Sequence, residues 1–124
     1  MLQLRSHINV ADNSGAKILE VIGMPGKGNL RIARVGDVVR CVVKKASSIG
    51  SVKSHEKVLV VIVRTKKETR RVDGSVIRFD DNAGVVLENL KEKLPKGTRV
   101  FGPIAREIKD MGYNKIASMA KEVY

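Results

Sequence analysis

Short apolar runs alternate along the chain with clusters of glycine, asparagine, aspartate and proline. Apolar runs of this length are typical of β-strands, and the clusters between them favour turns. The cluster DNSG at 12–15 is one such turn, because Asn and Gly accept positive φ and Asp bonds its own backbone. The pattern therefore predicts strands at 2–10, 16–22, 38–45, 58–66 and 83–89.

Two of these runs indicate which side chains face the interior. At 38–45 the alternation places Val39, Cys41 and Val43 on one inward face. The run VLVVIV at 58–63 has no polar position, as in a strand that is covered on both faces. We therefore expect 58–63 to be a central strand and Cys41 to be a small core residue.

A basic hairpin is predicted at 64–79, RTKKETRRVDGSVIRF. Asp73-Gly74 is typical of a type I′ turn, in which both central residues need positive φ. A two-residue loop gives the pairs Arg71–Val76, Thr69–Arg78 and Lys67–Asp80. In this register the basic side chains share one face of the hairpin, and Ile77 and Phe79 lie on the other.

Helical patterns occur only after the strands. Pro103 suits a first helical position, and NKIASMAKEV at 114–123 has the apolar spacing of a second short helix. The closely spaced strands argue for a small closed barrel with two short C-terminal helices. We therefore predict a mainly β fold in a single domain, 1–124, with the barrel and hairpin in 1–101 and the helical segment in 102–124.

Charge adds a prediction about partners. The chain has 24 Lys and Arg against 13 Asp and Glu, a net charge of +11, and a pI near 10.1. Such an excess favours a polyanionic partner, nucleic acid above all. The single cysteine and the lack of a membrane-length apolar run or a leader-like start lead us to expect a cytoplasmic, soluble protein.

The positive charge is concentrated in the middle of the chain. Ten cations and only two carboxylates lie between Arg40 and Arg71, as phosphate binding requires. Aromatic residues make up only 3%, too few for a groove that stacks successive bases, so we expect recognition of the RNA backbone and shape. The RNA-binding candidates are Arg40, Lys44, Lys45, Lys53, Arg64, Lys66, Lys67, Arg70, Arg71 and Arg78. Arg34, Arg99 and Arg106 are further candidates for bidentate phosphate contacts.

Enzyme chemistry finds little support in the sequence. The stretch GMPGKG at 23–28 has a lysine among glycines, but it lacks the order and the following helix of a phosphate-binding loop. His7, Cys41 and His55 are too scattered to hold a metal, and Asp80-Asp81 is expected to have a turn role. We expect no catalytic residues, no metal and no cofactor.

Three motifs resemble the bacterial L-fourteen family of large-subunit ribosomal proteins. They are ADNSGA (11–16), VVIVRTKKETRRVDGSVIRFDDNAGVVL (60–87) and GTRVFGPIARE (97–107). The resemblance runs over nearly the whole chain in the family's order and spacing. It implies a five-stranded barrel with a projecting β-ribbon and small C-terminal helices.

The resemblance also implies partners. A member of this family is a structural constituent that binds large-subunit (23S) rRNA and touches small-subunit (16S) rRNA at intersubunit bridges. The resemblance implies large-subunit proteins three and nineteen as neighbours and a ribosome-silencing factor as a further binding partner. The residues assigned to this second surface are Thr98, Arg99, Arg106 and Lys115. The alternative from another class is a basic protein-docking module that binds an acidic protein partner.

Overall fold

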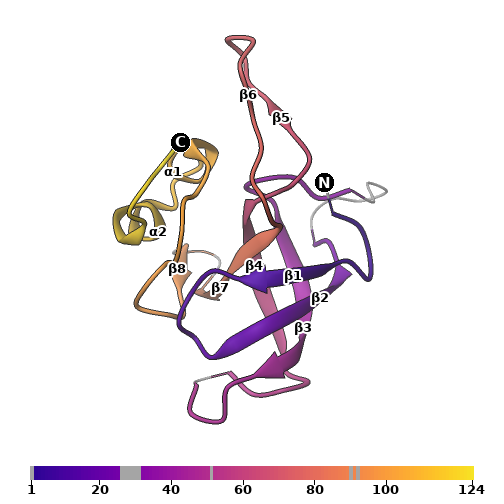
Figure 1. The fold of residues 1–124 in the computed structure, drawn as a ribbon. Coiled ribbons are helices and arrows are strands. Elements are labelled where there is room, and N and C mark those ends of the chain that lie inside the picture. The colour runs from indigo at the N-terminus through magenta and orange to yellow at the C-terminus, as the bar shows by residue number, and fades with distance from the viewer. Residues whose placement is uncertain (1, 26–31, 51, 90, 92) are drawn as a thin grey trace.

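Five strands form a closed barrel in the part of the chain that the computed structural model describes, residues 2–25, 32–50, 52–89, 91 and 93–124 (Figure 1). The antiparallel order is β1-β2-β3-β4-β7, and a parallel pairing of β1 with β7 closes it. The strands are β1 (His7–Val10), β2 (Ala16–Gly23), β3 (Val38–Ala46), β4 (Lys57–Arg64) and β7 (Ala83–Asn89). Residues 26–28 of the glycine-rich stretch lie outside the described residues.

The predicted barrel is thus confirmed, but two strands are shorter than predicted. The predicted strand 58–66 ends at Arg64. The first strand begins at His7 rather than at residue 2, because Arg5 has a φ of 68° and Leu4 is half exposed. One short strand, β8 (Leu94–Pro95), was not predicted; it adds to the outer edge of β7. Its pairing depends on a distant partner, so local apolar spacing gives no sign of it.

Two apolar cores lie on opposite sides of β4. Alternate residues such as Val60 and Ile62 point into the barrel, where they pack with Leu19 and Cys41. The residues between them, such as Val63, pack outside the barrel against the C-terminal segment. This arrangement confirms the prediction that the continuous apolar run is covered on both faces.

The barrel closes where β1 crosses close to β7. Gly84 pairs with Val10, and a Cβ at position 84 would lie 2.4 Å from Val60 Cγ1 and 3.1 Å from Val61 O. Both atoms belong to β4, so only a residue without a side chain fits at this point of β7. Glycine at position 84 therefore lets β7 lie close to β4 at the point where β1 closes the barrel.

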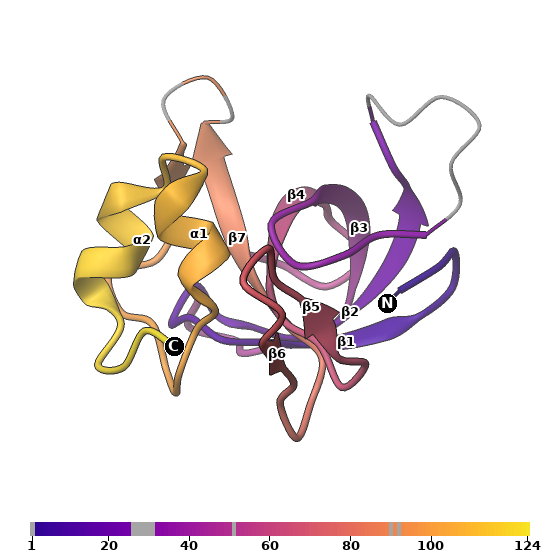
Figure 2. The same cartoon turned by 90° about the horizontal axis from the view of Figure 1, so that it is seen from above.

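Two short helices cover one side of the barrel next to β7, α1 (Arg106–Asp110) and α2 (Asn114–Met119) (Figure 2). Both predicted helix boundaries are too wide. Ile104 is held extended because it forms a parallel bridge with Val123, and Ala105 is the N-cap of α1. The same bridge keeps the chain after Met119 extended, so α1 does not begin at Pro103 and α2 does not reach residue 123.

The hairpin β5 (Thr69–Arg70) and β6 (Val76–Ile77) projects from the barrel as predicted, but in a different register (Figure 1). Thr69 pairs with Ile77, and Arg70 pairs with Val76. The Arg71 N–H donates to Ser75 O, which leaves a three-residue loop rather than a two-residue one. Gly74 supplies positive φ (89°) at the last loop position, as a three-residue hairpin loop needs. The predicted cross-strand pairs are therefore wrong by one residue.

Candidate nucleic-acid interface

The observed register divides the hairpin into two unlike faces. Arg70, Val76 and Arg78 are exposed, whereas Arg71 and Ile77 are half-buried on the other side. A shift of one residue moves every side chain to the opposite face. Arg70 and Arg78 therefore form the outward basic face, and Arg71 does not belong to it.

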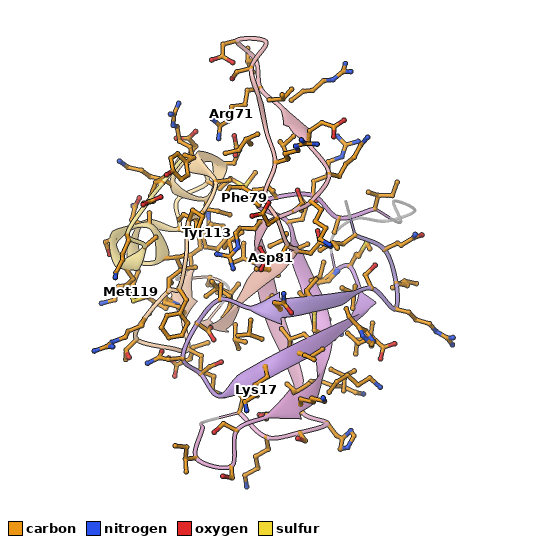
Figure 3. The ribbon with its side chains drawn as sticks, in the orientation of Figure 1. Lys17, Arg71, Phe79, Asp81, Tyr113 and Met119 are labelled. Atoms are coloured by element: carbon orange, nitrogen blue, oxygen red, sulfur yellow. The ribbon has the colours of Figure 1, made fainter. Side chains whose placement is uncertain are left out.

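Arg71 joins the hairpin to the C-terminal segment. Its Nε donates to Glu107 Oε1 at 2.7 Å, and its Nη2 donates to the backbone oxygen of Tyr124. The side chains of Arg71 and Glu107 are only 18% and 22% exposed. Figure 3 shows Arg71 on the hairpin beside the helical segment. Its guanidinium is thus already paired within the protein.

Arg64 is paired within the protein as well. At the end of β4 it is 8% exposed, and its Nη1 donates to the backbone oxygens of Phe101 (2.9 Å) and Pro103 (3.0 Å). Its Nε lies 3.0 Å from Asp81 Oδ1. A cation that is buried among these acceptors holds the 101–103 segment against the barrel and is not available to a phosphate outside.

The remaining predicted cations are exposed. They are Arg40, Lys44, Lys45, Lys53, Lys66, Lys67, Arg70 and Arg78. Lys44 pairs with Glu20 at 2.9 Å, and Lys67 pairs with Glu68 at 3.1 Å. The hydrogen bond from Lys44 lowers the pKa of Glu20. The pKa of Glu68 is lowered by a hydrogen bond from the backbone N–H of Glu68 itself and, second, by the hydrogen bond from Lys67. Surface pairs of this kind are weak and do not block a stronger polyanion.

These cations form two groups. One follows β3 and the loop after it, with Arg40, Lys44 and Lys45 on the barrel wall. The other lies around the hairpin, where Arg34 joins Lys67 and Arg70 at a shared pocket. The structure thus brings Arg34, distant in sequence, next to the predicted hairpin cations.

A second surface contains Thr98 and Arg99. Asn13 Oδ1 accepts hydrogen bonds from the N–H groups of Thr98 (2.7 Å) and Arg99 (3.0 Å), and Asn13 Nδ2 donates to Thr98 Oγ1 at 2.8 Å. Arg106 and Lys115 are also exposed, on α1 and α2. The sequence pattern indicated only a turn at Asn13. Its three hydrogen bonds reach residues 85 or more positions away, and no local pattern predicts such partners.

Asp12 fixes the same corner from the inside. Its Oδ1 accepts from the N–H and hydroxyl of Ser14, and its Oδ2 accepts from Val86 N–H at 2.9 Å. Burial raises the pKa of this carboxyl, and the three hydrogen bonds oppose that rise. The turn that presents Asn13 is therefore attached directly to β7.

The described residues hold no cluster of three or more His, Cys, Asp and Glu side chains that suits a metal. Cys41 is completely buried, and burial raises its pKa to about 12, so its thiol is unreactive. Among the described helices, none is long and apolar enough to cross a membrane.

The described residues form a small closed barrel that carries a basic hairpin, an arrangement that suits binding of an anionic partner. Comparison with known proteins gives the family. The model of the family described as "Ribosomal protein L14p/L23e" matches residues 1–124. The "Large ribosomal subunit protein uL14" of Petrotoga mobilis (strain DSM 10674 / SJ95) is 56% identical over 124 residues, which cover 100% of both chains.

The chain therefore belongs to the ribosomal protein L14p/L23e family. It is a structural, non-enzymatic constituent of the large ribosomal subunit, in the cytoplasmic ribosome. The family resemblance seen in the three sequence motifs is confirmed.

Proposed function

We propose that this protein binds large-subunit (23S) rRNA through the outward face of its hairpin and the cations of β3. The observation that carries the proposal is the pair Arg70 and Arg78. Both are exposed on one face of a projecting hairpin, and neither makes an ion pair with a carboxylate in the described part of the chain. Two exposed guanidinium groups on one face favour an anionic partner.

The mechanism combines phosphate neutralisation with a rigid frame. Each cation that meets a phosphate releases counterions, which supplies affinity without base recognition. Arginine adds a planar fork of donors that matches two phosphate oxygens. The closed barrel and the Arg71–Glu107 pair keep these donors at fixed separations, so RNA segments that bind them are fixed as well.

We further propose that Thr98, Arg99, Arg106 and Lys115 form the surface for intersubunit bridges with 16S rRNA. The support is geometric: Asn13 holds the backbone of Thr98 and Arg99 in one conformation, so their side chains are presented in a fixed arrangement. Large-subunit proteins three and nineteen, and a ribosome-silencing factor, remain partners proposed on family resemblance alone.

The test removes three charges from the hairpin and compares them with three removed elsewhere. The hairpin variant is Lys66→Gln, Arg70→Gln and Arg78→Gln. The control variant is Lys17→Gln, Lys109→Gln and Lys121→Gln, at exposed positions outside the hairpin and outside the RNA-binding set. Filter binding of a 23S rRNA transcript is measured between 50 and 200 mM salt, with thermal unfolding as the check on folding.

We expect the hairpin variant to lower the slope of log affinity against log salt by about 2, since each lost phosphate contact removes ~0.7–0.9. The control should lose much less. Equal losses in the two variants would show that only net charge matters and would overturn the assigned surface. Capture of large-subunit proteins that survives nuclease treatment would favour the protein-docking alternative instead.

A further inference from the structure

A pocket of about 320 Å³ lies at the base of the hairpin. It is formed where the segment that enters β3 meets the chain that leaves β4. The lining residues are Arg34, Thr65, Lys67, Glu68, Thr69 and Arg70. None of them is aromatic, so the pocket offers hydrogen-bond donors and positive charge but no ring on which a base would stack.

Positive charge dominates this pocket. Three cations and one carboxylate give its lining a net charge of +2. Lys67 Nζ lies 3.1 Å from Glu68 Oε1, so the carboxylate offsets that lysine. Arg34 and Arg70 are exposed and make no ion pair with another described residue. Two guanidinium groups are therefore left to bind an anion from outside the protein.

The walls of the pocket are fixed by hydrogen bonds from all sides. Arg34 N–H donates to Asp37 Oδ2 at 2.6 Å, which ties the Arg34 turn to the start of β3. Thr65 Oγ1 donates to Lys67 O at 2.9 Å, and Lys66 N–H donates to Asn82 Oδ1 at 2.9 Å. The pocket is thus formed before any ligand arrives, which reduces the ordering cost of binding.

We propose that this pocket binds one phosphate group of an RNA backbone, with Arg34 and Arg70 as its two forks. The inference rests on the proposed RNA-binding function and specifies its anchoring point. A backbone phosphate fits better than a free nucleotide, because the lining has no aromatic side chain for a base. Arg78 and Lys66 on the same hairpin extend the positive charge beyond the pocket for neighbouring phosphates.

Glu68 gives this proposal its sharpest test. A carboxylate in the lining repels an incoming phosphate, so Glu68→Gln should tighten binding of the 23S rRNA transcript several-fold. Arg34→Gln should weaken binding several-fold and lower the salt slope by about 1, the value for one lost phosphate contact. Lys17→Gln is the control, since Lys17 is exposed on β2, does not line the pocket and is not part of the proposed RNA-binding surface. Its effect should be smaller than that of Arg34→Gln.

Arg34 and Glu68 lie outside the hairpin triple variant, so the two proposals fail separately. If the triple variant loses RNA affinity while Arg34→Gln equals Lys17→Gln and Glu68→Gln does not tighten binding, the pocket assignment is overturned and the hairpin surface stands. If wild-type protein shows no salt-dependent RNA binding, the proposed function itself is wrong.

A second measurement separates an RNA phosphate from a small free anion. Nitrogen-15 signals of the Arg34 and Arg70 guanidinium groups are followed while inorganic phosphate, and separately the 23S rRNA transcript, is added. We expect both signals to shift with RNA and to respond to inorganic phosphate only at millimolar concentration. Saturation by micromolar phosphate, with RNA affinity unaffected by Arg34→Gln, would assign the pocket to a free anion and overturn the proposal.

Discussion

The barrel and the hairpin are both antiparallel β-structure, yet different forces stabilise them. Every barrel strand is paired on both sides and packs against apolar side chains. The hairpin has only two paired positions and no core of its own. Its position depends on polar attachments: Arg71 to Glu107 near the tip, and Arg64 with Asp81 at the base (Figure 3).

This difference explains how one run of similar cations has several uses. In RTKKETRR the first arginine is internal, the last joins the hairpin to the C-terminal segment, and those between them remain for a partner. Two-stranded hairpins are marginal alone in water, so some charge is needed to hold this one in place. Only the remaining cations are exposed for the proposed RNA binding.

The largest expected effect tests the barrel. Gly84→Ala puts a methyl group 2.4 Å from Val60 Cγ1 at the closure of β1 on β7, and it should destabilise the fold by about 3 kcal/mol, at the upper end for overpacking. Urea unfolding measures this.

Two glycines serve as controls for that substitution. Gly74 at the hairpin loop has open space around it, so Gly74→Ala should cost only about 1 kcal/mol through its positive φ. Gly23→Ala, whose Cβ would meet nothing closer than 3.9 Å, should stay within about 0.5 kcal/mol. Similar losses in all three would show that barrel closure is not tightly packed.

An intermediate effect tests the base of the hairpin. Arg64→Met keeps much of the side-chain volume but leaves Asp81 and two backbone oxygens without their donor. We expect a loss of about 2 kcal/mol, less than for a fully buried pair because Asp81 is partly exposed. Arg78→Met, at an exposed site, should change stability by about 0.5 kcal/mol or less. An Arg64 variant that keeps its stability but loses RNA affinity would return this residue to the RNA-binding surface.

The smallest expected effect distinguishes the two hairpin faces. Arg71→Gln removes the Glu107 pair and should cost about 1 kcal/mol, with faster hydrogen exchange at the Arg71 and Gly74 amides, which bond across the loop. Arg70→Gln should leave exchange unchanged and weaken RNA binding instead. A double-mutant cycle with Glu107→Gln isolates the pair, and zero coupling would mean that Arg71 does not tether the hairpin.

The sequence predicted those parts of the fold that depend on local pattern. Alternation located β2 and β3, and the unbroken run at 58–63 revealed a strand covered on both faces. The helix ends failed because the Ile104–Val123 bridge, which spans 19 residues, overrides a favourable proline. The hairpin register failed because Asp-Gly suits both a two-residue and a three-residue loop, and only cross-strand bonding chooses between them.

The candidate site was predictable in composition but not in detail. Clustered Lys and Arg indicated an anionic partner, and most of those residues are exposed. Charge counting treated Arg64 and Arg70 alike, although one is internal and the other faces outward. The difference arises from Asp81 and the carbonyls at 101 and 103, which no spacing rule connects to position 64.

The two carbonyls that accept from Arg64 flank Gly102, and a Cβ there would lie 2.4 Å from Arg64 Nη1. The Arg64 guanidinium thus supplies the hydrogen-bond donors for these two carbonyls that a neighbouring strand would otherwise supply. The exit from the barrel to the helices is therefore held by a side chain from β4 rather than by backbone pairing alone. The placement of both helices thus depends on one internal arginine.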